Sequence, residues 1–385
     1  INDMKIYDFD KIIERRGTGA VKTDALGKVF GKEELIPLWV ADMDFETPDF
    51  ITDALKERLE HPIFGYPVEP EDFKPSICDW VRNQHGWDVR KEWLCFIPGI
   101  VKGIGMAINA LLGKDEKVII QPPVYHPFRI IPQKNQREVV YNPLKETPTG
   151  YEMDFKNLEA VCDEKCKMLI LANPHNPAGI VWSRDTLVRL AEFCHKRGII
   201  VISDEIHCDM ALFGNKHIPF ASVSQEAAAC SITFGAPSKT FNIAGIVSSY
   251  AIVPDEDLRK RFFGWIEACE LGSAHLFAHV ATIAAFRKGE EWRRQMIEYI
   301  EGNIEFKNVS FRYYKNSEES VLDRINLHIP AGSTVGIIGS TGSGKTSLIN
   351  LIPRFYEATE GRVLVNGRDV KSLDVNTLRD GIAIV

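Results

Sequence analysis

Three polar residues that could bind a charged ligand, Asn176, Asp204 and Lys239, each stand just past a short apolar run of the sequence. Short apolar runs bounded by turn residues are typical of buried parallel strands. Ligands of open α/β sheets bind outside the carboxyl ends of such strands. Each residue alone would usually be solvated surface, but in this order they predict one ligand-binding rim made by a carboxylate, an amide and an amine.

A second group of residues has the spacing of a phosphate-binding loop. The segment 339–346 fits GxxxxGK[ST], follows an apolar run at 334–338 that we expect to be a strand, and precedes a helical pattern. Glycines let backbone amides wrap phosphate oxygens, while Lys345 would meet the β and γ phosphates and Thr346 would ligate magnesium. The predicted ATP-binding residues are Gly339, Ser340, Thr341, Gly342, Ser343, Gly344, Lys345, Thr346 and Ser347.

The elements that must position these residues follow two patterns. Between residues 49 and 253, amphipathic helical stretches alternate with apolar runs, which predicts an α/β sheet covered by helices. Four runs are expected to be strands: 118–120, 168–172, 199–203 and 231–234. Residues 256–299 predict one or two long helices. From residue 304 a period-two pattern predicts strands at 304–313 and 327–329, so we expect two domains, 1–302 and 303–385.

Composition narrows the class of protein. The 385 residues include 45% hydrophobic residues and carry a net charge of -7, with both signs interspersed, so we expect neither nucleic acid nor an anionic membrane as a partner. The eight cysteines have irregular spacing, which favours a reducing, cytoplasmic compartment. No apolar run reaches the roughly 18 residues of a membrane span. Because the chain starts at Ile1, we expect a fragment.

Several phrases together resemble the fold-type I pyridoxal-phosphate (PLP) enzymes, which include aminotransferases of class I and II, and more narrowly the MalY/PatB group of cystathionine β-lyases. These phrases lie at residues 37–45, 64–67, 121–125, 204–207 and 236–242. The resemblance covers roughly residues 4–303. It implies the α/β large domain of an aspartate aminotransferase-like enzyme, with a mostly parallel sheet and without its C-terminal small domain.

The resemblance also implies roles for individual residues. Lys239 would bind PLP covalently and move the substrate's Cα proton, and Asp204 would pair with the pyridine nitrogen. Asn176 and His207 would lie near the ring hydroxyl, and Ser238 is counted among the cofactor contacts.

The cofactor phosphate would lie at a helix N-terminus, where free amides and the helix dipole favour an anion. The remaining implied cofactor contacts are Gly99, Ile100 and Val101 at the phosphate, Tyr125 stacked on the ring, and Tyr66 reaching the phosphate from a neighbouring subunit. Tyr66 therefore implies a homodimer with a shared site. Val247 departs from the family, in which Arg or Gln is common near the phosphate.

The implied reaction is β-elimination from an amino-acid thioether such as cystathionine, which gives a thiol, pyruvate and ammonia. Transamination starts with the same proton removal and remains an alternative. An Arg in the C-terminal small domain usually holds the substrate carboxylate, and we expect this chain to lack it. PLP binding is therefore a firmer expectation than turnover, since a bidentate Arg supplies both energy and orientation.

Residues 303–385 resemble the start of an ABC exporter nucleotide-binding domain, a partial P-loop NTPase domain of α/β class. Tyr313 matches the aromatic residue that stacks on adenine. Because the resemblance stops before the catalytic half, we expect Mg-ATP binding without hydrolysis. The two families agree in sequence around residues 299–306, so the join reflects either recombination or an artefact of gene assembly, of which we favour the artefact. An ABC transporter component is a further alternative.

Two other pairs could hold a metal ion. His275 and His279 are four residues apart on an expected helix, and Cys162 and Cys166 have similar spacing. Neither pair is accompanied by a third ligand in a recognised motif, so we favour structural roles, with the histidines on a surface helix.

Overall fold

The computed structural model describes residues 5–148, 150–314, 320–330, 333, 335–340, 342–380 and 382. It divides into two compact units. The larger unit comprises Asp10–Arg293, and the smaller unit comprises Ile1–Phe9 together with Arg294–Val385. Each unit has its own hydrophobic core.

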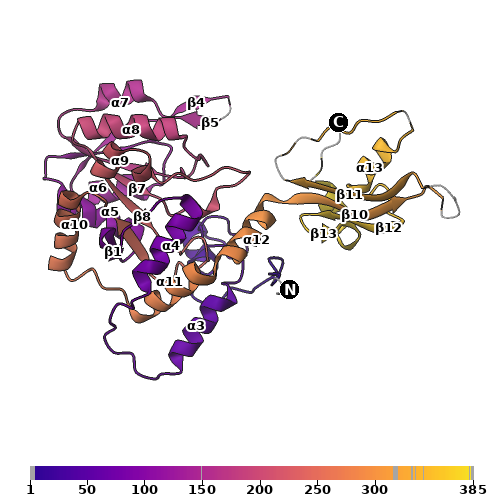
Figure 1. Ribbon diagram of the computed structural model, residues 1–385, viewed down its shortest axis with the longest axis horizontal. Helices are drawn as coiled ribbons and strands as arrows, with labels where there is room; N and C mark the ends of the chain where they lie inside the picture. Colours follow the sequence, from indigo (N-terminus) through magenta and orange to yellow (C-terminus); the bar gives the residue numbers. More distant parts are fainter. Residues whose placement is uncertain are drawn as a thin grey trace. The chain divides into compact units, whose positions relative to one another are not determined.

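A seven-stranded sheet in the order β1-β9-β8-β7-β6-β2-β3 forms the centre of the larger unit (Figure 1). The pairings among β8, β7, β6, β2 and β3 are parallel, and β9 is antiparallel to both of its neighbours. The strands are β1 Leu94–Ile97, β2 Lys117–Ile120, β3 Glu138–Tyr141, β6 Cys166–Ala172, β7 Ile200–Asp204, β8 Ser231–Gly235 and β9 Ser249–Ile252. A separate hairpin joins β4 Lys145–Thr147 and β5 Gly150–Glu152.

Helices cover both faces of this sheet because its strands are apolar on both sides. Successive side chains of β6 alternate between two cores: Met168 and Ile170 lie in one, Leu169 and Leu171 in the other. The first core includes α5 Ile100–Leu111, α6 Pro127–Lys134 and α10 Glu256–Ala268. The second includes α7 Phe155–Val161, α8 Arg184–Lys196 and α9 Gln225–Cys230.

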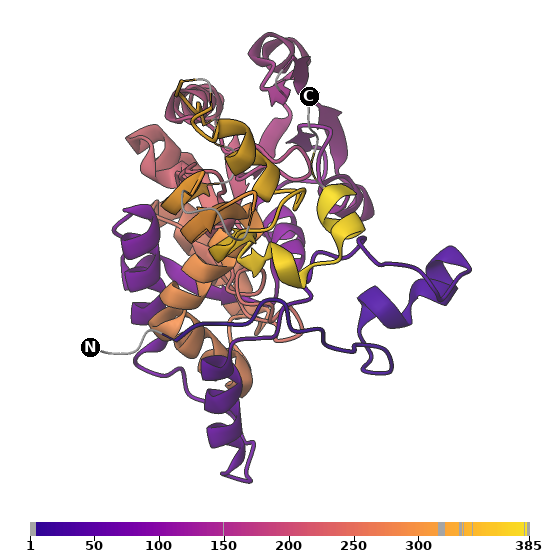
Figure 2. The ribbon, with the colours of Figure 1, turned by 90° about the vertical axis from the view of Figure 1, so that its right-hand side faces the viewer.

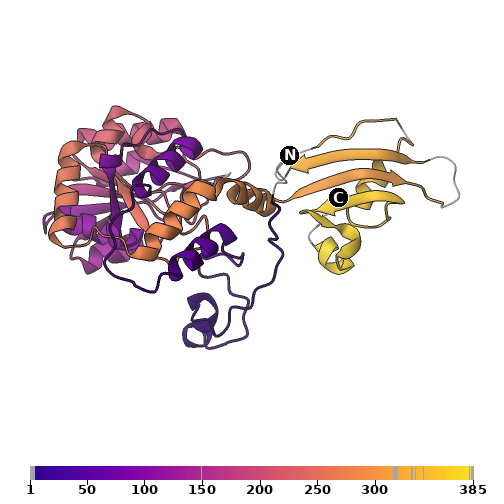
Figure 3. The ribbon, with the colours of Figure 1, turned by 60° about the horizontal axis from the view of Figure 1, so that its bottom comes forward.

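The N-terminal part of the larger unit runs outside these layers (Figures 2 and 3). It carries the short helices α1 Val21–Asp24 and α2 Leu26–Phe30. The helices α3 Asp49–Leu59 and α4 Phe73–His85 pack against α11 Leu276–Lys288. Short 3-10 turns lie at Lys91–Trp93, Cys208–Met210 and Phe220–Ser222.

A four-stranded antiparallel sheet in the order β11-β10-β12-β13 forms the smaller unit. Its strands are β10 Asn303–Phe311, β11 Leu322–Pro330, β12 Glu360–Val365 and β13 Arg368–Asp369. Its helices are α13 Lys345–Leu351 and α14 Val375–Asp380, with a 3-10 turn at Val370–Ser372. Phe306, Val309 and Leu351 are buried in its core. The helix α12 Glu290–Glu301 contains the point at which the two units divide.

The four predicted strands of the first domain are confirmed as β2, β6, β7 and β8. The expectation of one or two helices over 256–299 is wrong, since three form there. Glu270 has a φ of 56° just past the end of α10, and any side chain at Gly289, between α11 and α12, would clash with Phe241.

The predicted strand before the phosphate-binding loop is also wrong for its described part. Residues 335–340 form no strand and pair with none of the described strands, and the side chain of Ile338 is 99% exposed. An alternating or apolar sequence pattern alone does not form a central strand, because the backbone of such a strand needs adjacent strands to hydrogen-bond with. Among the described residues, no helix combines the length and apolar character that crossing a bilayer requires.

Candidate active site

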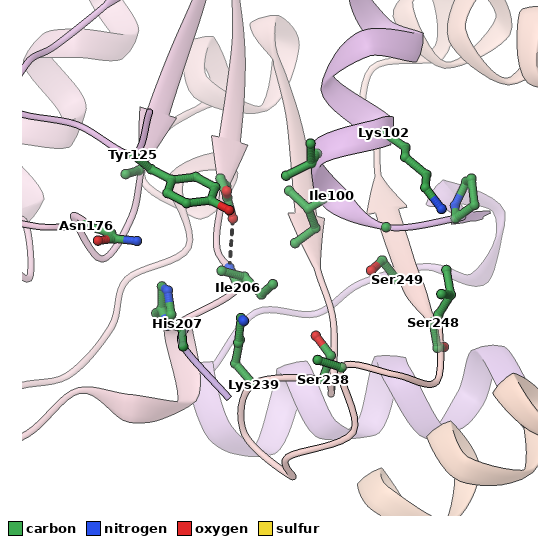
Figure 4. Close-up of a pocket in the computed structure, with 18 of the residues that line it drawn as sticks. Ile100, Lys102, Tyr125, Asn176, Ile206, His207, Ser238, Lys239, Ser248 and Ser249 are labelled. Carbon is green, nitrogen blue, oxygen red and sulfur yellow. Dashed lines mark hydrogen bonds between the residues drawn. The ribbon is translucent and has the colours of Figure 1, made fainter. Parts of the chain in front are cut away.

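A cavity of about 330 Å³ lies beyond the carboxyl ends of β6, β7 and β8 (Figure 4). Its wall contains every residue that we expected to contact PLP except Tyr66. These wall residues are Gly99, Ile100, Val101, Tyr125, Asn176, Asp204, His207, Ser238 and Lys239. The convergence follows from the fold, because parallel strands bring their carboxyl ends to one edge of the sheet.

Asp204 is the last residue of β7 and lies between Ala172 of β6 and Phe234 of β8 in the sheet register. Its carboxylate accepts a hydrogen bond of 3.1 Å from the amide of Ile206 (Figure 4). Burial raises the pKa of Asp204 to about 7, and the nearby charge of Lys239 opposes that rise. A cation placed beside this carboxyl group would favour its ionised form.

Lys239 lies in the loop that joins β8 to β9, and its amine points into the cavity (Figure 4). Burial lowers the pKa of this amine, while the carboxylates of Asp42 and Asp204 counteract the effect. A desolvated amine has more of its neutral, nucleophilic form than a lysine in water. His207 lies near Lys239 in the cavity wall (Figure 4). Burial lowers the pKa of His207 to about 4, and the charge of Lys239 lowers it further.

The N-terminus of α5 forms the opposite wall. Gly99 has a φ of 108°, a backbone conformation that favours glycine, and it turns the chain from β1 into the helix. The first backbone amides of an α-helix have no partner within the helix. The residues Ile100, Val101 and Lys102, which carry these amides, all line the cavity. A helix dipole and free amides together favour an anion at this wall.

Tyr125 and Asn176 come from two loops that the backbone joins, since the amide of Tyr125 donates to the carbonyl of Asn176 over 3.1 Å. The ring of Tyr125 packs edge-on against Phe128 and projects into the cavity (Figure 4). Burial raises the pKa of its phenol, and the charge of Asp204 adds to the rise. The phenol therefore stays neutral at physiological pH.

The chemistry of these groups fits PLP. A carboxylate suits the pyridinium nitrogen, an amine suits the aldehyde carbon, an aromatic face suits the ring, and a helix N-terminus suits the phosphate. One cavity brings all four together. Val247, which differs from the residue usual in the family, is also in the wall.

Two expectations lie outside this cavity. Tyr66 is fully exposed, at 107% of its reference area, so its own subunit does not bring it to the site. The described lining of the cavity contains the cation Lys102 but no arginine. That this chain binds a substrate carboxylate weakly, because it lacks the family's arginine, therefore remains a prediction.

A buried network that the sequence did not reveal lies behind Lys239. The carboxylate of Asp209 accepts hydrogen bonds from the hydroxyl of Thr240 at 2.8 Å and from the indole of Trp80 at 3.1 Å. His85 lies 2.9 Å from the same carboxylate. The network holds Thr240, the residue next to Lys239, in place. The only sign of this network in the sequence was a second aspartate, Asp209, shortly after Asp204 at the end of β7.

The predicted nucleotide-binding residues are in the smaller unit, apart from Thr341, which lies outside the described residues. Gly342 and Gly344 have φ values of 85° and 87°, and the amine of Lys345 donates to the carbonyls of Gly339 and Ser340 at 2.7 Å. Ser343, Thr346 and Ser347 follow on the same turn and on α13.

Tyr313, the predicted adenine contact, packs edge-on against Phe311 and Tyr356. Its hydroxyl lies 2.7 Å from that of Ser347. The ring is half exposed, so one side remains open to a ligand.

The predicted surface position of the histidine pair is right for His275, which is exposed, and wrong for His279. His275 caps the N-terminus of α11 through its ring nitrogen, whereas His279 is buried with its ring against Phe73. The prediction failed because α11 packs between α3 and α4 and has no solvent face at this point. Cys162 and Cys166 are buried free thiols, and burial raises the pKa of Cys166 to about 12.

Comparison with known proteins separates the two parts of the chain. Residues 322–385 match the ABC transporter family. A stretch of 88 residues is 41% identical to YgaD of Bacillus subtilis (strain 168), described as a multidrug export ATP-binding/permease protein, and covers 23% of this chain and 15% of YgaD. The similarity therefore extends over only a small part of the length of YgaD.

The larger part of the chain has longer matches. It is 46% identical to cystathionine beta-lyase PatB of Bacillus subtilis (strain 168) over 298 residues, which are 77% of each chain. The crystal structure of the PLP-bound C-S lyase from Staphylococcus hominis superposes with a TM-score of 0.71 at 38% identity, covering 77% of this chain and 74% of that one. Residues 33–333 match the family described as aminotransferase class I and II. The cavity and these relatives together establish that this chain belongs to the class I and II aminotransferase family of PLP-dependent enzymes.

Proposed function

We propose that the larger unit is a carbon-sulfur lyase that catalyses β-elimination from an amino-acid thioether such as cystathionine. The observation that carries the proposal is that Lys239 and Asp204 line one cavity together with the N-terminus of α5. The 46% identity to a cystathionine beta-lyase supports elimination over transamination.

Four parts of the chain would hold the cofactor. The α5 N-terminus would bind its phosphate, Tyr125 would pack on its ring, Asp204 would pair with its nitrogen, and Lys239 would bind it covalently. When bound, PLP supplies an electron sink for the carbanion at the substrate's Cα. Asn176 and His207 would contact the ring from the Tyr125 side, and Ser238 would contact it from the Lys239 loop.

Lys239 would then move the proton of the reaction. Its Nζ would remove the Cα proton, after which the Cβ–S bond breaks and the thiolate leaves with the bonding electron pair. Water completes the reaction, so that a thioether and water give a thiol, pyruvate and ammonia. Burial suits Nζ to this role because it lowers the amine pKa toward the working pH.

We propose a homodimer in the cytosol as the working form. Tyr66 is exposed on its own subunit, as expected of a residue that completes the site of a neighbour. All eight cysteines are free thiols, which suits a reducing compartment. Sedimentation at micromolar concentration should give twice the chain mass, and a monomer that retains PLP would contradict the dimer.

We further propose that residues 339–347 bind Mg-ATP. Two observations favour this proposal. Gly342 and Gly344 both have a left-handed backbone conformation. The amine of Lys345 donates to the carbonyls of Gly339 and Ser340, and a nucleotide phosphate would replace these carbonyls as its partner.

Substitution of Lys239 tests the lyase proposal. The wild-type chain, incubated with PLP and reduced with borohydride, should carry a phosphopyridoxyl group on the peptide that contains residue 239. Lys239→Ala should carry none there and should release no pyruvate from cystathionine, whereas Lys102→Ala should keep the label. A wild-type chain that takes up no PLP, or a label that survives in Lys239→Ala, would refute the assignment.

A further inference from the structure

A second cavity, of about 620 Å³, adjoins Lys239. Lys239 and Ala244 line both cavities. The rest of its wall comes mainly from the N-terminal segment and includes Arg15, Lys22 and Asp42. Lys239 therefore has a carboxylate in each cavity wall: Asp204 in the first and Asp42 in the second.

The two oxygens of Asp42 have different surroundings. Oδ2 contacts the guanidinium of Arg15. Oδ1 is buried and has no hydrogen-bond partner among the described residues. The surroundings of a buried oxygen have a low dielectric constant, so the charge of this carboxylate acts on nearby groups with less screening than the charge of a surface carboxylate.

Asn242 holds the segment that carries Asp42 against the Lys239 loop. Its side chain accepts from the amide of Met43 at 3.0 Å and donates to the carbonyls of Met43 and Phe45 at 2.9 and 2.7 Å. The hydroxyl of Thr47 donates to its backbone carbonyl at 3.0 Å. These bonds span 195 to 199 residues of sequence and fix the residue next to Asp42 to the third residue after Lys239.

Charged and titratable groups face Lys239 from each element around it. They are Asp204 and His207 after β7, Tyr125 before α6, Lys102 in α5, and Asp42, Asp44, Glu46, Arg15 and Lys22 in the N-terminal segment. Of the carboxylates, Asp204 would be engaged by the cofactor nitrogen. Asp44 is 63% exposed and bonded to Lys22, and Glu46 is 58% exposed and bonded to Lys11. That leaves Asp42, with its buried Oδ1, as the carboxylate available to Lys239.

We propose that Asp42 is a positioning residue whose charge sets when the nitrogen of Lys239 carries a proton. A carboxylate favours the protonated form of a neighbouring amine, so Asp42 offsets the effect of burial. Arg15 moderates this influence because it neutralises one oxygen. The inference rests on the proposed role of Lys239 as the group that moves the Cα proton.

Asp42→Asn tests the proposal through the pH dependence of the PLP-loaded chain's visible absorbance, which reports the protonation of the Lys239 nitrogen. The midpoint should fall by about one pH unit, the lower end of the shift that a nearby opposite charge causes. Asp42→Glu should restore most of the midpoint. Arg15→Gln should move it in the opposite direction, since it removes a cation from the same place.

Asp44→Asn is the matched control, because it removes the same charge two residues away from an exposed side chain that also contacts Arg15. Its midpoint should stay within about 0.3 pH unit of wild type, since exposed charges are strongly screened. Equal midpoints for Asp42→Asn and wild type would overturn the inference while leaving the lyase proposal intact.

The chain without PLP provides an independent arm. The rate at which an amine-acylating reagent modifies Lys239, followed by peptide mass spectrometry across pH, should show the same downward shift in Asp42→Asn. If the wild-type chain takes up no PLP, the lyase proposal fails, and this arm alone decides on Asp42. An unshifted acylation profile overturns the inference.

Discussion

Replacing Asn242 should loosen the larger unit because one side chain fastens the N-terminal segment to the loop of Lys239. The change Asn242→Gly removes three side-chain hydrogen bonds. Glycine adopts the φ of 55° at this position without strain, so the substitution does not disturb the backbone. Each bond contributes about 0.5 to 1.5 kcal/mol net, and the site is half buried. We therefore expect the free energy of unfolding to fall by about 2 to 3 kcal/mol.

Tryptophan fluorescence during guanidinium unfolding measures this loss selectively. All seven tryptophans lie between residues 10 and 293, so the signal reports the larger unit alone. Gln136→Gly is the control, since Gln136 has a φ of 59° and an exposed side chain for which no hydrogen bond is seen among the described residues. Its stability should stay within about 0.5 kcal/mol of wild type. If both variants lose the same amount, the bonds of Asn242 do not hold the segment.

Two further predictions concern the two ligand sites. Asp204→Asn should stabilise the PLP-free chain above pH 7, by on the order of 4 kcal/mol, because the folded pKa of about 7 lies above the reference value of 3.8 and burial therefore opposes ionisation. The gain should vanish as the pH falls below about 3, where both states are protonated. A gain that is independent of pH in urea titrations would refute this origin. Mg-ATP should raise the melting temperature of the smaller unit in wild type but not in Lys345→Ala, and equal shifts in both would refute the phosphate loop as the site.

The sequence predicted that Asn176, Asp204 and Lys239 would lie at one edge of the sheet, because this arrangement depends on strand ends. Asp204, Asn176 and Lys239 each follow an apolar run, and parallel pairing of those runs brings them to one edge. Register places Asp204 directly, whereas Asn176 and Lys239 lie in the loops that follow β6 and β8. The other residues of the list came from the family resemblance, and all of them except Tyr66 line the cavity.

What the sequence could not predict depends on contacts between distant segments. Met43 and Asn242 are 199 residues apart, and no local pattern indicates that they are hydrogen-bonded to each other. The apolar run 334–338 had the composition of a strand, but composition does not supply neighbours that bond it. His279 was misplaced for a related reason, since helix periodicity cannot say that a second helix covers the expected outer face.

The reversed direction of β9 has a consequence for how the site is assembled. Because β8 and β9 are adjacent and antiparallel, the loop that carries Lys239 leaves and re-enters the sheet at the same rim, from Gly235 to Ser249. The entropy of closing this loop is therefore lost when the sheet folds, and the cofactor does not have to bring its ends together. The loop that carries Lys239 is therefore already ordered before PLP binds. PLP binding then does not bear the entropic cost of ordering the lysine to which PLP attaches, and its affinity is not lowered by that cost.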